Sequence, residues 1–341
     1  MKVSAPAKII LIGEHYVVYG APAVAFTVDR YNHITFQELE GEVRLEGKNP
    51  GFGEFIIYPD GRYVNAQNRD EMRMFIKIYQ RIIEKTNLNK ALKAVWSSDG
   101  TIKGMGASAS FSTALALGLY KVAGIEPSED ELFECAQIGD EYAHGGRPSG
   151  IDAKTVVSGT GIIFKKEFNP VQFTFTKTKV VFPKETGILI VDTYRGKRGS
   201  TADLVKLFAE KHNISKPPSE LTDNERAKLC FEYDNIYKNI IKELTESGNP
   251  ETLGKLFLDS HFLLRNGGVS TDEIEEVIKL SINNGALGAK LTGAGGPGGA
   301  VIVYAYKKDF ENLKNVLNKA GYNSLDANPA VKGVGVHDKK N

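Results

Sequence analysis

The sequence is poor in cysteine, which excludes several kinds of stabilising or binding site. Its 341 residues include only Cys135 and Cys230, too few for a disulfide framework in a chain of this length. Both cysteines lie in helical patterns, where we expect buried thiols. No Cys/His spacing in the sequence matches a structural zinc site.

Excess charge of one sign and long apolar segments are missing as well. Lysine and arginine number 43 against 42 aspartates and glutamates, a formal net charge of +1, which argues against a nucleic-acid-binding surface. No apolar run approaches the roughly 18 residues of a membrane span. The polar start of the chain leads into an apolar run too short for a signal peptide. We expect a soluble, cytoplasmic protein without nucleic-acid or membrane partners.

Glycine, by contrast, is abundant and unevenly distributed. Four windows (residues 13–20, 100–106, 139–161 and 285–299) hold 18 of the 35 glycines. Glycine lets the backbone approach a neighbour closely or adopt a positive φ. Because these windows fall between predicted helices and strands, we interpret them as loops that face a ligand.

Hydrophobic periodicity predicts an α+β chain of two mixed lobes, divided softly near Pro183 and Gly187 into residues 1–183 and 184–341. For the first lobe we expect strands at 8–12, 23–28, 33–38, 55–58, 91–96, 161–164 and 173–176, and helices at 71–84, 108–120 and 128–142. For the second we expect strands at 187–191, 289–292, 300–304 and 331–336, and helices at 201–211, 225–243, 251–265, 271–282 and 308–320.

The segment Gly104-Met105-Gly106-Ala107-Ser108 leads into a strong helical pattern. Glycines before a helix expose free backbone N–H groups at the positive end of the helix dipole, which is a phosphate site in physical terms. Ser108 could add a hydroxyl to a phosphate or to a bound Mg²⁺. It could equally be an ordinary N-cap. The segment lacks the Gly-Lys-Ser/Thr of a Walker A loop.

A second glycine run, residues 293–298, formally fits the dinucleotide pattern G-x-G-x-x-G. We reject that interpretation because the pattern must open a helix, whereas residues 299–304 have the composition of a strand. A loop between two strands could still pack against a nucleotide or support the first glycine loop. The alternative is a tight connection without a ligand.

Acidic residues accompany the third glycine window. Asp152, after Pro148-Ser149-Gly150-Ile151, could act as a base toward a hydroxyl or could cap a short helix over 153–158. Asp140 and Glu141 lie at the end of a predicted helix, where negative charge opposes the dipole. A bound cation would offset that cost, although solvated surface carboxylates explain the pair as well.

Taken together, these segments resemble the mevalonate kinases, a family within the GHMP superfamily of small-molecule kinases. Residues 6–25 (PAKIILIGEHYVVYGAPAVA) resemble the first motif, and 104–110 the second, phosphate-binding motif. Residues 144–152 resemble the segment around Pro-Ser-Gly-Ile-Asp, and 290–296 (KLTGAGG) the third motif. Thr201 before Leu204-Val205 matches the family's helix after a strand. The motifs occur in the family's order.

The resemblance implies a fold with a ribosomal-protein-S5-like N-terminal lobe and a ferredoxin-like C-terminal lobe. It also implies ATP- and Mg²⁺-dependent phosphorylation of a small alcohol, best matched by mevalonate becoming 5-phosphomevalonate in isoprenoid precursor biosynthesis. Asp152 would accept or attract the hydroxyl proton, and Lys8 would stabilise the alkoxide. Whether the chain forms a homodimer is open.

By the same resemblance, the remaining functions fall on matching positions. ATP phosphates are assigned to Lys103, Gly104, Met105, Gly106, Ala107, Ser108, Ala109 and Ser110, supported by Gly293, Ala294 and Gly295. The acceptor substrate is assigned to Lys8, Glu14, His15, Val18, Ser149, Gly150, Asp152 and Thr201. Magnesium is assigned to Ser108 with Glu141, which spacing from Asp152 selects. Spacing from His144 selects Asp140 instead.

Several departures from the family pattern concern the substrate. Met105 and Ala107 replace usual members of the second motif, and Pro297 replaces a glycine of the third. Arg147 adds one residue before Pro148, and residues 193–199 (TYRGKRG) are unusually basic. Extra cations near the acceptor would suit a phosphorylated substrate, so a kinase acting on phosphomevalonate, or on another hydroxyl of mevalonate, is the first alternative. The second is a non-catalytic relative that binds ATP and a metabolite.

Overall fold

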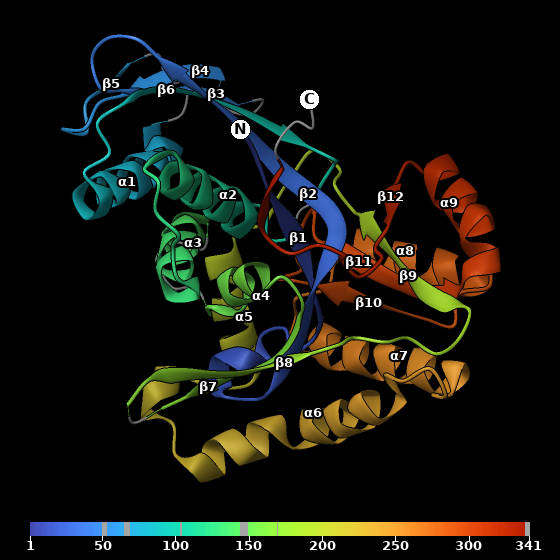
Figure 1. Ribbon diagram of the computed structural model, residues 1–341. Coiled ribbons are helices and arrows are strands. Elements are labelled where there is room, and N and C mark those ends of the chain that lie inside the picture. Colours follow the sequence, from blue (N-terminus) through green and yellow to red (C-terminus); the bar gives the residue numbers. More distant parts are fainter. Residues whose placement is uncertain (50–52, 65–68, 103, 144–148, 169, 338–341) are drawn as a thin grey trace.

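The computed structural model describes residues 1–341 except 50–52, 65–68, 103, 144–148, 169 and 338–341. Two β-sheets, each covered by helices, form the two lobes (Figure 1). The prediction of two mixed α+β lobes is confirmed. Within the described part of the chain, no helix has the length and apolarity to cross a membrane.

The N-terminal lobe is built on a nine-stranded sheet in the order β13-β1-β2-β6-β3-β4-β5, with β7 paired to β2 and β8 paired to β7. Its strands are β1 (Lys2–Ile12), β2 (Ala23–Leu39), β3 (Leu45–Asn49), β4 (Gly53–Ile57), β5 (Tyr63–Val64), β6 (Ala91–Ser98), β7 (Gly161–Glu167), β8 (Gln172–Thr178) and β13 (Gly335–His337). Its helices are η1 (Tyr16–Tyr19), α1 (Arg69–Thr86), α2 (Ala107–Val122), α3 (Glu129–Ala143) and α4 (Ile151–Ser158).

The C-terminal lobe has an antiparallel four-stranded sheet in the order β10-β11-β9-β12. Its strands are β9 (Thr186–Asp192), β10 (Gly288–Thr292), β11 (Ala300–Tyr306) and β12 (Asn323–Asp326). The helices of this half are α5 (Thr201–Lys211), η2 (Pro218–Glu220), α6 (Asp223–Glu243), α7 (Pro250–Asn266), α8 (Asp272–Asn283), η3 (Lys307–Asp309) and α9 (Phe310–Lys319).

Local sequence signals explain where several helices begin. Ser128 and Glu131 form a capping box at the start of α3, with each side chain bonded to the other residue's backbone N–H. Thr222 and Glu225 do the same for α6. The side chain of Asn249 caps α7 ahead of a proline at the first helical position. These residues fix the helix starts independently of tertiary packing.

Some sequence predictions were wrong. The strands expected at 23–28 and 33–38 are one strand, β2, because the chain continues through residues 29–32: Tyr31 and Asn32 pair with Pro6 and Ala5 of β1, after a shift in register between Pro6 and Ala7. Strands β3, β5 and β12 were missed. The strand expected at 331–336 is limited to residues 335–337 and pairs with β1, so the end of the chain returns to the N-terminal sheet. The change of sheet near the predicted boundary falls between β8 and β9.

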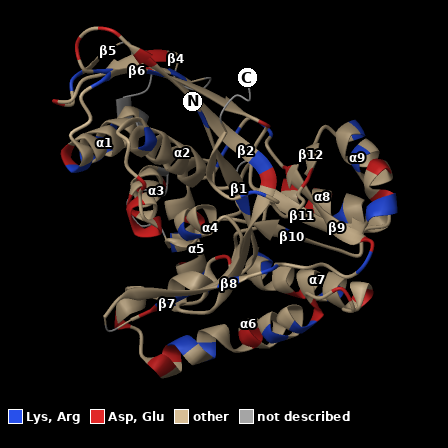
Figure 2. Ribbon diagram, viewed as in Figure 1, with Lys and Arg blue, Asp and Glu red and all other residues tan. Residues whose placement is uncertain are grey.

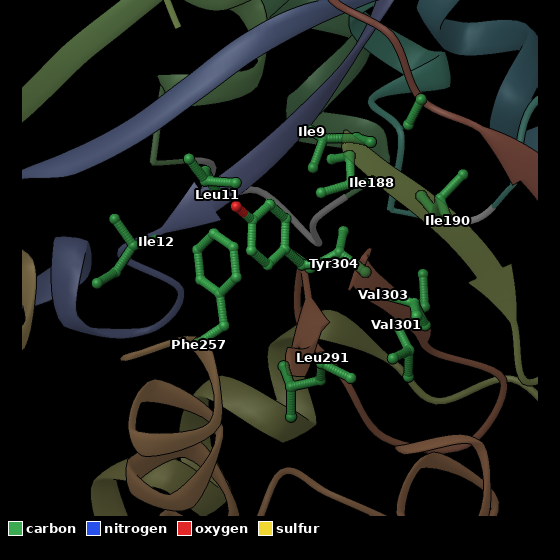
Figure 3. Packing of buried hydrophobic residues seen from close by; sticks show 14 of the residues in the cluster. Ile9, Leu11, Ile12, Ile188, Ile190, Phe257, Leu291, Val301, Val303 and Tyr304 are labelled. Carbon is green, nitrogen blue, oxygen red and sulfur yellow. The ribbon is translucent and has the colours of Figure 1, made fainter. Parts of the chain in front are cut away.

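A continuous apolar core joins the two lobes. Figure 3 shows Ile9 and Leu11 of β1 near Ile188 of β9, with Phe257 of α7 and Tyr304 of β11 close by, all in one buried cluster. Charged residues of both signs are interspersed along the outer helices (Figure 2). The predicted buried thiols are confirmed, since both cysteines are free and buried. The apolar contact between the lobes fixes the walls of the cavity described next.

Candidate active site

A cavity of about 460 Å³ lies between the lobes and is lined by residues from both. The N-terminal lobe contributes the end of β1 and the segments that precede α2 and α4. The C-terminal half contributes the start of α5 and the loop between β10 and β11. Predicted site residues that line the cavity are Lys8, Glu14, His15, Val18, Gly104, Gly106, Ala107, Ser108, Ser149, Asp152, Thr201, Gly293, Ala294 and Gly295. Four glycine-containing segments that are distant in sequence therefore meet at one site.

Lys8 and Asp152 form an ion pair on the cavity wall. Lys8 Nζ lies 2.8 Å from Asp152 Oδ1 and also donates to the carbonyl of Gly104 at 3.1 Å. The Lys8 side chain is 1% exposed and that of Asp152 13% exposed. Gly150, not Asp152, occupies the N-cap of α4, so the carboxylate is not used as a cap. A carboxylate beside a desolvated ammonium can receive a proton next to a group that stabilises an oxyanion.

The N-terminus of α2 opens onto the cavity next to this pair. Gly106, with φ +65°, is the N-cap and has no side chain to cap the helix, so the alternative that Ser108 serves as the N-cap is excluded. A Cβ on Gly106 would lie 2.8 Å from Cγ and Cε of Lys8, which explains why only glycine fits. The free N–H groups of the first turn and the helix dipole favour an anion here.

Not every residue of this predicted phosphate loop lines the cavity. Met105 is fully buried, and its sulfur accepts from the backbone N–H of Ile102 at 3.1 Å. Ser110 donates to the carbonyl of Ala5 at 2.9 Å, and Ala109 is buried beside it. These buried side chains anchor the loop to the protein interior rather than facing the cavity. Lys103 lies outside the described residues.

The hydroxyl of Ser108 is directed at one of the two candidate acids. It donates to Asp140 Oδ1 at 2.8 Å, while Asp140 Oδ2 accepts from the backbone N–H of Ala153 at 3.1 Å. Neither acid lines the cavity itself, but Asp140 is buried behind Ser108 whereas Glu141 is exposed. The geometry therefore favours Asp140, which spacing from the histidine had selected, over Glu141.

This arrangement fits a magnesium ion. Among the described residues, no cluster of three or more His, Cys, Asp or Glu side chains could hold a metal by itself. Mg²⁺ commonly takes only one or two carboxylates from the protein and completes its shell with water and phosphate oxygens. The paired hydroxyl and carboxylate of Ser108 and Asp140, next to the α2 N-terminus, supply that kind of partial site.

Glu14 and His15 follow β1 in a strained turn. The backbone N–H of Tyr16 bonds to the carbonyl of Glu14 at 2.6 Å, and His15 between them has φ 59° and ψ −46°. This is a γ-turn with positive φ, which is rare and strained for a residue other than glycine. The surrounding structure must therefore hold the turn in place.

The C-terminal lobe supplies contacts that hold the Glu14–His15 turn in place. His15 Nε2 lies 3.0 Å from the carbonyl of Ala294, and the His15 ring stacks on Phe208 with centroids 4.9 Å apart. Burial lowers the pKa of His15 to about 4, although the Ala294 carbonyl acts in the opposite direction. The ring is therefore neutral at physiological pH, with Nε2 as the donor and Nδ1 as an acceptor.

Two further contacts join β10 to this region. Lys290 Nζ lies 2.5 Å from Glu14 Oε1, and both side chains are essentially unexposed. Thr292 Oγ1 donates to the carbonyl of Ile10 at 2.8 Å. Burial lowers the pKa of Lys290, and the adjacent Glu14 carboxylate opposes that shift. No sequence signal predicts the Lys290–Glu14 pair, because its members lie 276 positions apart.

The basic segment 193–199 contributes one cation to the cavity. Arg198 lines it, but its guanidinium also pairs with Asp192 at 3.1 Å and donates to the carbonyl of Gly298 at 2.8 Å. Arg195 instead donates to Ala320 at the end of α9 and covers the ring of Tyr322. The predicted cluster is therefore divided. Arg147 lies outside the described residues.

Sequence reasoning placed Gly150 in the pocket, but this glycine is buried and does not line the cavity. Its φ of +87° instead allows the chain to enter α4. Residues that complete the walls without having been singled out as candidates are Ile10, Val17, Thr101, Ile102, Val205, Thr292, Gly299 and Ala300. Most are apolar or small, and their sequence context does not distinguish them from core residues.

Comparison with known proteins identifies relatives along most of the chain. The GHMP kinases N-terminal domain matches residues 73–160, and the GHMP kinases C-terminal domain matches residues 240–323. The curated mevalonate kinase of Pyrococcus furiosus is 33% identical over 326 residues, covering 90% of each chain.

Solved structures share the fold. The mevalonate kinase of Methanococcus jannaschii superposes with a TM-score of 0.75 at 24% identity, covering 96% of this chain and 98% of that one. The L. major mevalonate kinase in complex with R-mevalonate gives a TM-score of 0.74 at 24% identity, covering 96% of each chain.

Proposed function

Because this chain belongs to the GHMP kinases and has their two-lobed fold, we propose that it transfers the terminal phosphate of ATP to the 5-hydroxyl of mevalonate. Its relatives at 30–33% identity include curated mevalonate kinases. The observation that carries the proposal is the Lys8–Asp152 pair, 2.8 Å apart, in the same cavity as the uncapped N-terminus of α2.

In the proposed reaction Asp152 receives the proton of the attacking hydroxyl. Lys8 stabilises the negative charge that develops on that oxygen. In a loose phosphoryl-transfer transition state, positioning and charge stabilisation supply most of the catalysis. The backbone N–H groups at the start of α2, with Gly104 and Gly106, hold the phosphates. Gly293, Ala294 and Gly295 line the cavity next to this loop, where Gly293 lies beside Gly104.

Ser108 and Asp140 would hold Mg²⁺. When bound, the ion neutralises charge on the phosphates as the terminal group is transferred. Asp140 also accepts from the backbone of α4, the helix that carries Asp152. Helix α4 therefore positions both Asp140, which would hold the ion, and Asp152, which acts on the hydroxyl.

The acceptor is proposed to lie against Glu14, His15, Val18, Ser149 and Thr201, all of which line the cavity. With Nε2 committed to Ala294, neutral His15 offers Nδ1 as an acceptor, and this buried nitrogen has no hydrogen-bond partner among the described residues. A substrate hydroxyl could donate to it. A cytoplasmic location completes the proposal.

A kinase for phosphomevalonate is the second candidate, because Arg198 adds a cation to the cavity. The ion pair of Arg198 with Asp192 weighs against this candidate, because the carboxylate already balances much of the charge of the guanidinium. A coupled ADP-release assay with mevalonate, phosphomevalonate, homoserine and galactose separates the candidates. We expect turnover with mevalonate. Turnover with phosphomevalonate alone would refute the proposal, and ATP binding without turnover of any alcohol would indicate a non-catalytic protein.

A further inference from the structure

We infer that Lys290 is a positioning residue for the acceptor site: its buried ion pair with Glu14 holds the strained Glu14–His15 turn of one lobe against strand β10 of the other. The inference rests on the proposed function in one respect, namely that Glu14 and His15 face the acceptor substrate. Its other premises are observed contacts between the N-terminal and C-terminal lobes.

The first premise is the isolation of the pair from water. The side chains of Lys290 and Glu14 are 0% and 1% exposed. The Lys290 ammonium also donates to the carbonyl of Leu291 at 2.6 Å. A buried charge that loses its partner is strongly unfavourable, whereas a paired and hydrogen-bonded one is tolerated. Each side chain therefore constrains where the other can lie.

The second premise is the conformation of the turn. Gly13 has φ +121°, and a Cβ there would lie 2.3 Å from Cβ of Ala23. The next-but-one residue, His15, also has a positive φ. A segment with two unusual backbone conformations persists only when its surroundings determine it from several sides. The side-chain contacts of Glu14 and His15 with β10 and the loop after it provide that determination.

The third premise is the location of these contacts relative to the cavity. Glu14 lines the cavity, whereas Lys290 does not. Lys290 therefore acts on the acceptor through Glu14 rather than by direct contact. Among the described residues, no hydrogen bond or ion pair joins Lys290 to the phosphate loop at the start of α2. Loss of Lys290 should consequently affect the acceptor and leave ATP binding unchanged.

The test is Lys290→Met, measured as separate KM values for acceptor and ATP with whichever acceptor the wild-type enzyme turns over. We expect the acceptor KM to rise roughly tenfold because the turn is misplaced, with the ATP KM within about twofold of wild type. Lys154→Met is the matched control. Lys154 is also buried, at 7% exposure, but contacts the ring of Phe175 and does not line the cavity. It should leave both KM values unchanged.

A second background separates positioning from general destabilisation. In Glu14→Gln protein the carboxylate is gone, so adding Lys290→Met should change the acceptor KM by less than about twofold. This comparison also serves if Lys290→Met alone does not fold, because the double variant leaves no unpaired buried charge.

Equal effects of Lys290→Met in both backgrounds, or equal rises in both KM values, would overturn the inference. An acceptor KM that does not change would also overturn it. The proposed function fails separately, if the wild-type enzyme does not phosphorylate mevalonate.

Discussion

The low pKa of His15 makes a quantitative prediction about stability and pH. Burial lowers this pKa from 6.5 to about 4 in the folded protein, while the unfolded chain keeps the ordinary value. Between these two values the unfolded state binds a proton that the native state does not. The free energy of unfolding should therefore decrease as the pH falls from 6.5 to about 4 and stop responding to this residue below that.

The size of the effect follows from the shift. Each pH unit in this window costs about 1.4 kcal/mol, so the full loss attributable to His15 is about 3 kcal/mol. Above pH 7 the contribution is constant because the ring is neutral in both states. The side chain is 6% exposed, so solvent screening reduces the figure little.

The comparison protein is His15→Gln, which does not titrate but keeps an amide donor for the carbonyl of Ala294. Urea unfolding of both proteins at pH 7, 5.5 and 4 gives the difference in their unfolding free energies. Fluorescence of Trp96, the single tryptophan, and circular dichroism should be followed together to check that the transitions coincide.

We expect the unfolding free energy of wild type minus that of His15→Gln to decrease by about 3 kcal/mol between pH 7 and pH 4. Other titrating groups, such as His261, occur in both proteins and cancel. A change in the turn's backbone strain would add an offset that does not vary with pH. Parallel pH profiles for the two proteins would refute the assignment of a buried, neutral His15.

Other predictions concern the catalytic side of the cavity. Asp152→Asn should lower kcat by roughly 10²–10⁴ with the ATP KM nearly unchanged, and unchanged turnover would remove it as the base. Asp140→Asn should raise the Mg²⁺ concentration for half-maximal rate at least roughly tenfold, whereas Glu141→Gln should not; the reverse result would restore Glu141. Gly106→Ala should lower kcat at least roughly tenfold, because its Cβ would lie 2.8 Å from the lysine that pairs with Asp152. Gly124→Ala, at a similar φ of +76° with open space around it, should lower only the unfolding free energy, by about 1 kcal/mol; equal kcat values for the two alanine variants would contradict the steric argument.

The parts of the site that sequence could predict are those with a local physical signature. A glycine segment before a helix identified the phosphate side of the cavity, whereas Lys8, which lies beside that segment, was assigned only through the family resemblance. The choice between Asp140 and Glu141 could not be made in the same way. Neighbouring positions on a helix point about 100° apart, so a one-residue ambiguity in spacing decides whether a carboxylate meets Ser108 or solvent.

Contacts between the lobes were beyond prediction for a different reason. The Lys290–Glu14 pair depends on how two sheets pack and on the path of a turn with positive φ values. Neither property has a signature in a single sequence. The same limit explains why the return of β13 to the N-terminal sheet was missed, since a three-residue strand is defined by its partner rather than by its own pattern.

The position of Lys8 follows from the packing of β1. Lys8 and Ile10 line the cavity, whereas Ile9 between them lies in the core that joins the lobes (Figure 3). Successive side chains of a strand point to opposite faces, so a shift of one residue would move Lys8 into that core. The burial of Ile9 opposite Phe26 therefore fixes the register that brings the lysine to Asp152. In this protein the apolar contact between the lobes and the placement of the catalytic pair are two consequences of one strand alignment.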